Sequence, residues 1–390
     1  MDKVRFGVVG LGNIGALHAQ AIAADKTGQM ALAAVCDIIP QRAEKFGREL
    51  SAPFFTDAQA MFDAGLIDAA VIAVPHYWHA PVAIRAARKG IHVLCEKPLA
   101  VTVGPARAMI AQCRQHPVAL GAMLQQRTRA VMVKLKELVA GGELGEVFRV
   151  QMICSSWYRT QAYYDSGAWR GTWDGEGGGV LINQAPHSLD LFQWLGGLPR
   201  RVIAAIGTRV HKIEVENTVN AVCLYGDGKA GYIYATTAEA PGLEQFILCG
   251  DKATAVAEGG KIRLGKLREP ISHHLMHSPG GFEMPPCDWQ EAPLAAEPGG
   301  EHMNVTRAFA AHLLKGTPMV ATGEEAINEL ELSNAIYLAG YTNKPVDLPV
   351  DAGQISRLIA RLIRERSTGR GGNLRAAAAR DLRRLGVQTQ

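Results

Sequence analysis

The sequence predicts an α/β protein of two domains: a doubly wound parallel sheet, followed by a second α/β domain built on a large, mainly antiparallel sheet. Three observations predict this fold. A glycine-rich turn joins the first apolar strand to the first helix, strand-like and helix-like segments alternate as far as about residue 122, and strand-like runs with few helices follow Arg127. A chain of 390 residues is too long for one ordinary hydrophobic core. We therefore expect domains 1–123 and 124–390.

The N-terminal segment has the pattern of a dinucleotide-binding turn in a Rossmann fold. Val4–Val9 is a short β-branched run that predicts a buried strand, and a helix with apolar periodicity starts at about Asn13. Between them, the first glycine of Gly-x-Gly-x-x-Gly allows a tight turn, the second lets the backbone approach a pyrophosphate, and the third lets the helix pack close to the strand. The helix N-terminus favours phosphates. The cofactor residues expected here are Gly10, Gly12, Asn13, Ile14 and Gly15.

An acidic residue ends the second predicted strand. Leu32–Cys36 is apolar, and Asp37 follows it at the distance expected for a ribose-binding carboxylate. Such a carboxylate accepts hydrogen bonds from the adenosine ribose and repels a 2′-phosphate, which favours NAD over NADP. Arg42 lies nearby and could stack on adenine or meet a phosphate, so NADP stays open as the less favoured cofactor.

Two further strand ends of the first domain carry the expected chemistry. The remaining strands and helices predicted there are Ala69–Val74, His92–Cys95, Val118–Met123, Gln41–Leu50, Ala80–Lys89 and Pro105–Gln115. Ligands bind at the carboxyl ends of such strands. Ala69–Val74 ends at Pro75, and His92–Cys95 ends at Glu96-Lys97-Pro98. A lysine at this edge is placed to exchange a proton with a substrate hydroxyl, whereas the alternative is a surface Lys-Pro turn.

The sequence predicts that the second domain consists mainly of strands, with few helices. One helix is expected at Ala130–Ala140. Strand-like runs are expected at Val147–Cys154, Arg201–Arg209, Thr218–Leu224, Gly231–Thr237 and Glu244–Leu248. Residues 270–300 are rich in Pro, Gly and His, which predicts a long loop.

A second chemical segment follows a run of three glycines at 177–179, which lets the backbone approach something closely. Asn183, His187 and Asp190 then lie along an expected helix start. Asn183 and His187 are four residues apart and would share a helix face. A lone histidine is more often a packed core residue than a catalyst. His187 is therefore considered catalytic only together with the Glu-Lys-Pro segment at the strand end.

Residues 157–173 hold three of the six tryptophans, mixed with Tyr, Arg, Gln and Asp. Aromatic faces cover the C–H faces of a sugar ring, and the polar side chains hydrogen-bond its hydroxyls. The substrate residues expected are Tyr158, Arg159, Tyr163, Trp169, Arg170, Trp173 and, just after the domain junction, Arg127. The alternative is an aromatic core beneath the sheet. Few lysines gather here, which argues against a strongly anionic substrate.

Composition excludes several other classes. With 48% hydrophobic and 20% charged residues, no apolar run of membrane-spanning length and no signal peptide before the first strand, the chain reads as a cytoplasmic globular protein without a membrane partner. Seven cysteines show no ligand spacing, which favours buried, reduced thiols. His273, His274 and His277 suggest a metal, but no carboxylate is apparent nearby and the chemistry needs none, so no metal is expected.

The C-terminal segment is strongly basic. From residue 355 to 390 there are nine arginines against two acids. An apolar stripe predicts a docked helix and is formed by Ile355, Leu358, Ile359, Leu362 and Ile363. A break at 367–373 precedes a second short helix at 374–385. No aromatic residues are interleaved with the arginines, so a nucleic-acid partner is not expected.

Four stretches together resemble one family. GLGNIG, the EKP triplet, GGGVLINQAPHSLD and SNAIYLAGYTNKPVDLPVD are similar to the glucose–fructose oxidoreductase, inositol dehydrogenase and MocA family, over nearly the whole chain. The resemblance implies a Rossmann domain with a mainly antiparallel α/β domain, a nicotinamide cofactor, and dimers or tetramers built through the sheet. It also implies reversible oxidation of a sugar or cyclitol hydroxyl.

By this resemblance, Lys97 is the catalytic lysine and His187 is the histidine that assists it. The stretch expected beside the nicotinamide includes Val74, Pro75, His79, Glu96 and Lys97. The chain departs from many members at Asn183, where they carry Asp, and at Ala185, where they carry Gly. Because an amide cannot charge His187 as a carboxylate would, the hypothesis is that Lys97 carries the proton while Asn183 and His187 orient substrate hydroxyls.

The sequence therefore predicts an NAD-dependent dehydrogenase that oxidises a ring hydroxyl, at C3 of a sugar, glycoside, anhydrosugar or cyclitol. Reduction of a ketosugar would use the same residues. A second class is a glycoside hydrolase that uses NAD to form a transient ketone. A third is a non-catalytic module that retains the nucleotide fold.

Overall fold

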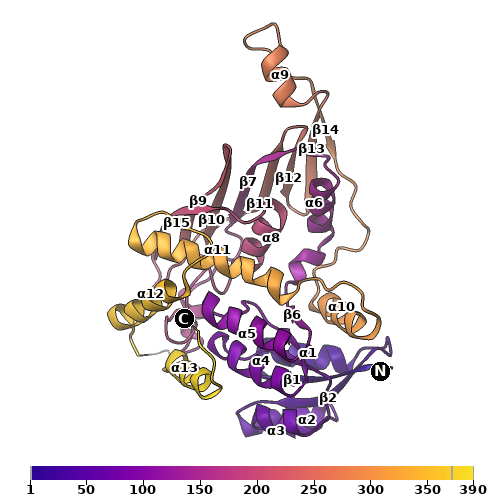
Figure 1. Cartoon of the computed structure of the whole chain (residues 1–390), viewed down its shortest axis with the longest axis vertical. Coiled ribbons are helices and arrows are strands. Elements are labelled where there is room, and N and C mark those ends of the chain that lie inside the picture. Colours follow the sequence, from indigo (N-terminus) through magenta and orange to yellow (C-terminus); the bar gives the residue numbers. More distant parts are fainter. Residues whose placement is uncertain (1, 370–371, 390) are drawn as a thin grey trace.

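The computed structural model describes residues 2–369 and 372–389 and contains two sheets, one in each half of the elongated molecule (Figure 1). The first is a six-stranded parallel sheet in the order β3-β2-β1-β4-β5-β6. Its elements are β1 (Val4–Val9), α1 (Asn13–Ala23), β2 (Met30–Cys36), α2 (Pro40–Glu49), β3 (Phe54–Phe55), α3 (Ala58–Asp63), β4 (Ala69–Ile72), α4 (His79–Arg88), β5 (His92–Cys95), α5 (Val103–Gln115) and β6 (Leu120–Ala122), with short 3₁₀ turns at His76–Trp78 and Gln125–Thr128. The doubly wound parallel sheet is confirmed.

The second sheet has nine strands in the order β14-β13-β12-β11-β7-β10-β9-β8-β15. Only β7 and β10 pair in parallel, so the expected mainly antiparallel sheet is confirmed. Its elements and the helices beside it are α6 (Ala130–Ala140), β7 (Val147–Cys154), α7 (Gln161–Asp165), α8 (Pro186–Gly196), β8 (Arg201–Gly207), β9 (Thr218–Gly226), β10 (Lys229–Thr236), β11 (Glu244–Gly250), β12 (Ala253–Glu258), β13 (Lys261–Leu267), α9 (Ile271–His277), β14 (Cys287–Glu291), α10 (His302–Lys315), α11 (Gly323–Thr342), β15 (Val346–Asp347), α12 (Ala352–Arg366) and α13 (Leu374–Arg384).

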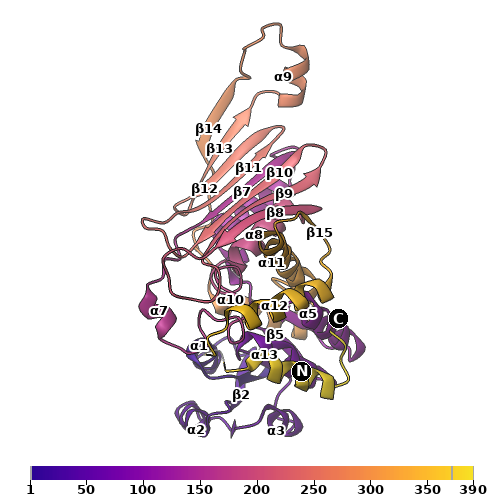
Figure 2. The same cartoon turned by 90° about the vertical axis from the view of Figure 1, so that its left-hand side faces the viewer.

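The expectation of a long loop at 270–300 is wrong in part. Residues Ile271–His277 form α9, and Cys287–Glu291 form the edge strand β14 against β13. These two elements project from the end of the nine-stranded sheet (Figures 1 and 2). The sequence did not predict β14 because it is short, is exposed at all five residues and lies in a segment rich in Pro and Gly.

The two faces of the nine-stranded sheet differ. Helices α8 and α11 cover one face, where α11 is buried along most of its length and contacts β8. The other face is open in this chain (Figure 2). Cross-strand register places Val222 beside both Ile203 and Tyr232 on that face, and the last two side chains are 46% and 44% exposed.

The C-terminal half returns to the first sheet. Phe309 of α10 packs in one core cluster with Phe6 and Val8 of β1, and Gly121 of β6 forms an isolated bridge with Thr322. Helix α12 buries the predicted apolar stripe, which confirms the docked helix, and Arg85 of α4 forms an ion pair with Asp381 of α13. Arg370 and Gly371 of the predicted break lie outside the described residues. Within those residues, no helix combines the length and the apolar character that crossing a membrane requires.

Candidate active site

The glycine turn leaves room at the start of α1. Gly10 has φ +88°, and a Cβ there would lie 2.5 Å from the carbonyl oxygen of Ala73. A Cβ at Gly15 would lie 1.8 Å from the carbonyl oxygen of Gly10, whereas one at Gly12 would meet nothing within 4 Å. No side chain caps the first turn of α1, which contains Asn13 and Ile14. Uncapped N–H groups beside open space suit a pyrophosphate, so these residues fit a dinucleotide.

Asp37 lies at the carboxyl end of β2, beside this turn. Its carboxylate accepts hydrogen bonds from the backbone N–H groups of Leu11 (2.8 Å) and Ile39 (2.9 Å) and pairs with Arg42 at 3.2 Å. The backbone bonds fix the carboxylate at the rim of the turn.

Lys97 follows β5 at the same edge of the parallel sheet. Its Nζ donates a hydrogen bond of 2.8 Å to the backbone carbonyl of Asn183, which joins the two chemical segments predicted from the sequence. Burial lowers the pKa of Lys97, and the charge of Arg159 lowers it further, while Glu96, Glu329 and Glu176 oppose this shift. A lysine with a lowered pKa is suited to accept a proton near neutral pH.

Glu96 is a buried carboxylate in front of this lysine. Its Oε1 lies 2.7 Å from Nε2 of His18, and its Oε2 accepts the backbone N–H of Lys97 at 3.1 Å. Burial alone would raise the pKa of Glu96, but the hydrogen bond and charge of His18, together with the charge of Lys97, bring it to about 2. Glu96 therefore stays ionised and acts as a fixed negative charge.

The side chain of Asn183 is an amide, but it contacts the carboxyl group of Glu176. Its Nδ2 donates to Oε1 of Glu176 and, at 3.2 Å, to the hydroxyl of Tyr163. Glu176 is 1% exposed, and its Oε2 accepts the backbone N–H of Gly171 at 2.6 Å. Burial raises the pKa of Glu176 to about 7, because these donors and the charges of Arg170 and Lys97 offset only part of the desolvation. This acid can change charge near neutral pH.

His187 lies on α8, and Asn183 does not. Helix α8 begins at Pro186, and Asn183 lies in the turn that precedes it, so the expectation of a shared helix face is wrong. Nε2 of His187 lies 3.3 Å from Nε2 of Gln125, whose amide also lies 3.0 Å from Nε2 of His302. With the Gln125 amide oriented as in this structure, its nitrogen donates and Nε2 of His187 accepts, which assigns the proton of a neutral His187 ring to Nδ1.

Nδ1 of His187 is buried and has no hydrogen-bond partner within the described residues. Burial and the charge of Lys97 lower the pKa of His187 to about 3, so the ring is neutral near neutral pH. A neutral ring with a free N–H group orients a hydroxyl rather than transferring a charge. An orphaned buried donor of this kind is suited to a ligand oxygen.

His79 and Pro75 line the adjoining strand end. Nδ1 of His79 lies 2.8 Å from the carbonyl of Pro98, and Nε2 lies 2.9 Å from the carbonyl of Val74. The ring thereby ties the end of β4 to the Lys97-Pro98 turn, which has a cis peptide bond. His79 braces this turn, so its place beside a nicotinamide stays a proposal.

The aromatic segment holds two guanidinium groups over one ring. Cζ of Arg159 lies 4.8 Å and Cζ of Arg170 lies 4.4 Å from the ring centroid of Tyr163. Arg170 also lies 4.6 Å from the Trp169 ring and donates to the hydroxyl of Tyr163 at 2.5 Å. Tyr158 is 51% exposed at the start of this segment. These side chains adjoin Asn183 through the Tyr163 hydroxyl.

Two of the expected substrate residues lie elsewhere. Arg127 is 3% exposed and donates to both carboxylate oxygens of Asp190, at 2.7 and 2.8 Å. Trp173 is fully buried, and its Nε1 donates to the carbonyl of Glu214 at 2.9 Å. Both side chains have their polar groups satisfied inside the protein. We therefore correct these two assignments and place Arg127 and Trp173 in the core.

The three glycines at 177–179 make room for the protein itself. A Cβ at Gly178 would lie 2.1 Å from the hydroxyl of Tyr337, and one at Gly179 would lie 1.7 Å from the carbonyl oxygen of Glu216. The run therefore lets the Asn183 segment pack tightly against α11 and the turn before β9. This packing fixes the carbonyl of Asn183, which accepts the hydrogen bond from Nζ of Lys97.

The histidines at 273–277 lie far from this site, on the projecting helix α9 (Figure 1). The expectation that they lack a carboxylate is wrong, because Glu269 binds both His273 and His274 at 2.8 Å. Over the described ranges, no group of three or more His, Cys, Asp or Glu side chains is arranged to hold a metal ion.

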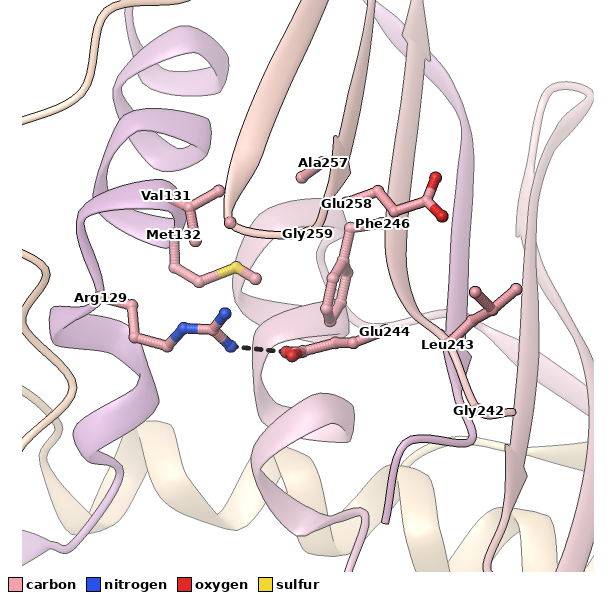
Figure 3. A pocket seen from close by; sticks show the side chains of 11 residues that line it. Arg129, Val131, Met132, Gly242, Leu243, Glu244, Phe246, Ala257, Glu258 and Gly259 are labelled. Atoms are coloured by element: carbon pink, nitrogen blue, oxygen red, sulfur yellow. Dashed lines mark hydrogen bonds and ion pairs between the residues drawn. The ribbon is translucent and has the colours of Figure 1, made fainter. Parts of the chain in front are cut away.

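A separate hollow lies between α6 and the nine-stranded sheet (Figure 3). Arg129 extends into it and pairs with Glu244 at 2.6 Å, beside Met132 and Phe246. The charge of Arg129 is already neutralised by Glu244, and the titratable groups around Lys97 do not line this hollow. We therefore place the candidate site at the carboxyl edge of the parallel sheet, around Lys97 and Asn183, and call this region the crevice.

Sequence analysis missed several residues of the site. They are His18, Gln125, Glu176, His302 and Glu329. Gln125, His302 and Glu329 come from segments without a motif, and only tertiary packing brings them to the site, whereas His18 lies on the helix that follows the glycine turn. Glu176 carried a usable signal, because it directly precedes the three glycines in a segment already singled out.

A parallel sheet with an uncapped glycine turn, an acid after β2 and a partly buried lysine after β5 is typical of a dinucleotide-dependent oxidoreductase. Residues 4–123 match the model of an oxidoreductase family with an NAD-binding Rossmann fold, and residues 132–256 match the GFO/IDH/MocA C-terminal domain. The chain belongs to the GFO/IDH/MocA family of oxidoreductases, as the resemblance predicted.

Individual relatives agree with this assignment. Inositol 2-dehydrogenase of Rhizobium meliloti (strain 1021) is 25% identical over 338 residues, which cover 85% of this chain and 95% of that protein. The rhizopine catabolism protein MocA of Rhizobium meliloti is 28% identical over 60% of this chain and 71% of its own length. The structure of the WlbA dehydrogenase from Bordetella pertussis, in complex with NADH and UDP-GlcNAcA, superposes with a TM-score of 0.74 at 30% identity and covers 90% of this chain and 100% of that chain.

Proposed function

We propose that the crevice oxidises a ring hydroxyl of a sugar or cyclitol with NAD⁺, at C3 of the ring, and that Lys97 takes the hydroxyl proton. The observation that carries the proposal is the position of Lys97, partly buried at the carboxyl edge of the parallel sheet and bonded to the Asn183 segment. The relatives named as inositol 2-dehydrogenase and the sugar-nucleotide complex of WlbA support this class of substrate.

When bound, NAD⁺ accepts the hydride that leaves the carbinol carbon. The amine of Lys97 takes the proton from the oxygen on the same carbon, so that a carbonyl forms. The backbone carbonyl of Asn183 holds Nζ in place, and the free N–H group of His187 donates to an oxygen of the substrate. Reduction of a ketosugar reverses each transfer with the same residues.

The charges around Lys97 set its protonation. Burial and Arg159 favour the neutral amine, which is the form that accepts a proton, and Glu96 and Glu176 favour the ammonium form. Glu96 is permanently ionised, whereas Glu176 changes charge near pH 7. Oxidation should therefore speed up as pH rises through the pKa of Lys97.

The test is NADH formation, followed by its near-ultraviolet absorbance, with NAD⁺ and a panel of inositols, aldoses, glycosides and anhydrosugars. Substrate-dependent NADH is expected, and Lys97→Met should slow it by a factor of about 10² to 10⁴. Lys89→Met is the matched control, because Lys89 pairs with Asp63 at the far end of α4. NMR of the ketone product tests the assignment to C3.

Three outcomes would contradict parts of the proposal. If Lys97→Met keeps its turnover while His187→Ala loses it, the proton role belongs to His187. Release of free sugar from a glycoside without net NADH would favour the hydrolase that works through a transient ketone. Absence of both would return the chain to the non-catalytic class.

We also propose NAD rather than NADP as the cofactor, and a homodimer or homotetramer built through the open face of the nine-stranded sheet. Asp37 supports the first, and the exposed pair of Ile203 and Tyr232 supports the second. Ile203→Glu is expected to lower the molar mass measured by light scattering, from that of a tetramer to that of a dimer or from that of a dimer to that of a monomer. An unchanged mass would remove this face as the interface.

A further inference from the structure

Within the described residues, no carboxylate lies at ion-pair distance from Arg159 or Arg170, although the charge of Arg170 favours the ionised form of Glu176 against the effect of burial. Arg159 donates a hydrogen bond to the carbonyl of Tyr158 (3.0 Å), and Arg170 donates one to the hydroxyl of Tyr163 (2.5 Å). Both groups stand over the Tyr163 ring. Two like charges that share one ring are costly to hold together unless something negative joins them.

Several other partly buried arginines of this chain pair with acids, although within the described residues the side chains of Arg149 and Arg375 bond only to neutral groups. Arg42 pairs with Asp37 and Arg129 with Glu244, and the buried Arg127 is bidentate with Asp190. Figure 3 shows the ion pair of Arg129 and Glu244 among the residues that line the hollow beside α6. The local feature of the aromatic segment is that two cations share one ring and, over the described ranges, neither has a carboxylate at ion-pair distance.

A second observation shows that Arg159 is prepared for a partner. Its Nε is buried and has no hydrogen-bond partner, although the neighbouring nitrogen is bonded. Stacking between Trp157, at 5.6 Å, and Tyr163 holds the plane of the guanidinium. A fixed planar fork with an unused donor matches the geometry of a carboxylate or a phosphate.

The two arginines adjoin the reacting lysine. Arg170 bonds Tyr163, Tyr163 bonds the side chain of Asn183, and the carbonyl of Asn183 bonds Lys97. The charge of Arg159 also reaches Lys97, because it lowers the pKa of that lysine. A group bound by these arginines would therefore belong to the same small molecule whose hydroxyl meets Lys97. In Figure 2, the short helix α7, which carries Tyr163, lies among the loops between the two sheets.

We infer that Arg159 and Arg170 form a subsite for an anionic group of the substrate, so that the sugar oxidised here carries a carboxylate or a phosphate. This inference rests on the proposed function and narrows its substrate class. It also corrects the expectation that the scarcity of lysines argues against an anionic substrate, because arginines supply the charge.

The test is isothermal titration calorimetry of the enzyme with NAD⁺ present, at a pH where the sugar is not turned over. The probes are matched sets of a neutral hexose, its hexuronate and its 6-phosphate in the gluco, galacto and manno series. In at least one series we expect the charged sugar to bind about tenfold more tightly than the neutral one. This advantage should shrink as salt rises, because part of it is electrostatic.

Variants assign the effect to the two arginines. Arg159→Gln and Arg170→Gln should each reduce the ratio of neutral to anionic Kd by about tenfold, and Arg170→Lys should restore part of it. Arg201→Gln, which removes an exposed cation on β8, should leave the ratio unchanged. Because the salt dependence is measured on the wild-type enzyme, the inference stays testable if a variant does not fold.

The outcomes separate the two proposals. A preference for the hexuronate or for the phosphate supports the subsite and identifies its ligand group. Equal binding of charged and neutral sugars in every series, or a preference that survives both arginine variants, overturns it. Calorimetry needs no turnover, so a failure to form NADH with any sugar contradicts the proposed function and leaves the anion preference measurable.

Discussion

Two arginine sites near the crevice have opposite surroundings. Arg127 is 3% exposed and bidentate with Asp190, so its charge is neutralised inside the protein. Arg159 and Arg170 are partly exposed, stack on Tyr163 and have no acid partner within the described residues. The first site holds α8 against the turn that follows the parallel sheet, and the second offers donors to a ligand. All three arginines had been expected to contact substrate.

The difference shows what makes a charged side chain functional. A buried ion pair with both partners satisfied has no capacity left for a ligand, and removing one partner leaves an uncompensated charge. A cation held by aromatic faces alone keeps its donors. Whether an acid faces the arginine, and not the arginine itself, therefore separates a core role from a binding role.

The most direct test of this difference is to replace an arginine of each site and to compare the losses of stability. Arg127→Met should lower the free energy of unfolding by about 3 to 5 kcal/mol, because Asp190 then stays buried without a partner. Arg170→Met should cost about 1 to 2 kcal/mol, since it removes ring contacts and one hydrogen bond to the Tyr163 hydroxyl but no ion pair. Urea denaturation of both variants measures this contrast, and equal losses would show that the two sites do not differ.

Asp37 and Arg42 are an intermediate case, a pair at the rim of the cofactor turn. Asp37→Asn removes the charge that repels a 2′-phosphate and releases Arg42 to bind one. The preference for NAD⁺ over NADP⁺, measured as the ratio of kcat/KM values, should fall by about tenfold. Lys45→Gln on the exposed side of α2 is the control. An unchanged ratio would show that Asp37 does not select the cofactor.

Glu176 is the acid whose charge Arg170 and Lys97 both affect, and Glu176→Gln sharpens the comparison. Above pH 7 the ionised carboxylate favours the ammonium form of Lys97. Removing it lowers the pKa of Lys97, so the rising limb of the pH profile for oxidation should move to lower pH by about 1 unit. Glu258→Gln at the end of β12 should leave the profile in place. A shift to higher pH would contradict the account.

The same acid links stability to pH. Folding raises the pKa of Glu176 from 4.5 to about 7, so the folded state holds this proton more tightly. Its contribution is complete below pH 4.5 and is lost as pH rises through 7. Compared with the wild type, Glu176→Gln should therefore gain in unfolding free energy between pH 5 and pH 8. A difference that stays constant with pH would show that Glu176 does not titrate there.

The smallest effect is expected at the surface. Arg201 and Asp347 form an exposed ion pair between β8 and β15, where water screens both charges. Arg201→Gln should not measurably change the denaturation midpoint or the turnover. A clear loss of either would mean that this pair contributes more than its exposure allows.

The parallel sheet was predictable because its information is local. The glycine spacing, the apolar strands and the acid after β2 each reflect a nearby backbone requirement, and the structure has them within a few residues of the expected bounds. Lys97 was placed at the crevice for the same reason, since every parallel strand ends at that edge.

The rest of the site depends on contacts between distant segments. Arg127 and Arg170 look alike in the sequence, and only the position of Asp190 on α8 distinguishes them. Gln125 and His302 meet at His187 although 177 residues separate them. Because many family members have Asp where this chain has Asn183, the sequence suggested that the site lacks a carboxylate. In the folded protein, however, the carboxyl group of Glu176 accepts a hydrogen bond from the Asn183 side chain. No spacing rule contains these relations.

One measurement tests the central claim most directly. A sugar that forms NADH is supplied with deuterium on all its ring carbons, and the nicotinamide product is analysed by mass spectrometry for the wild type and for Lys97→Met. The account predicts one deuterium transferred to the cofactor for each ketone formed, at a much reduced rate in the variant. Deuterium that stays on the sugar while product is released, or equal rates in both proteins, would contradict it.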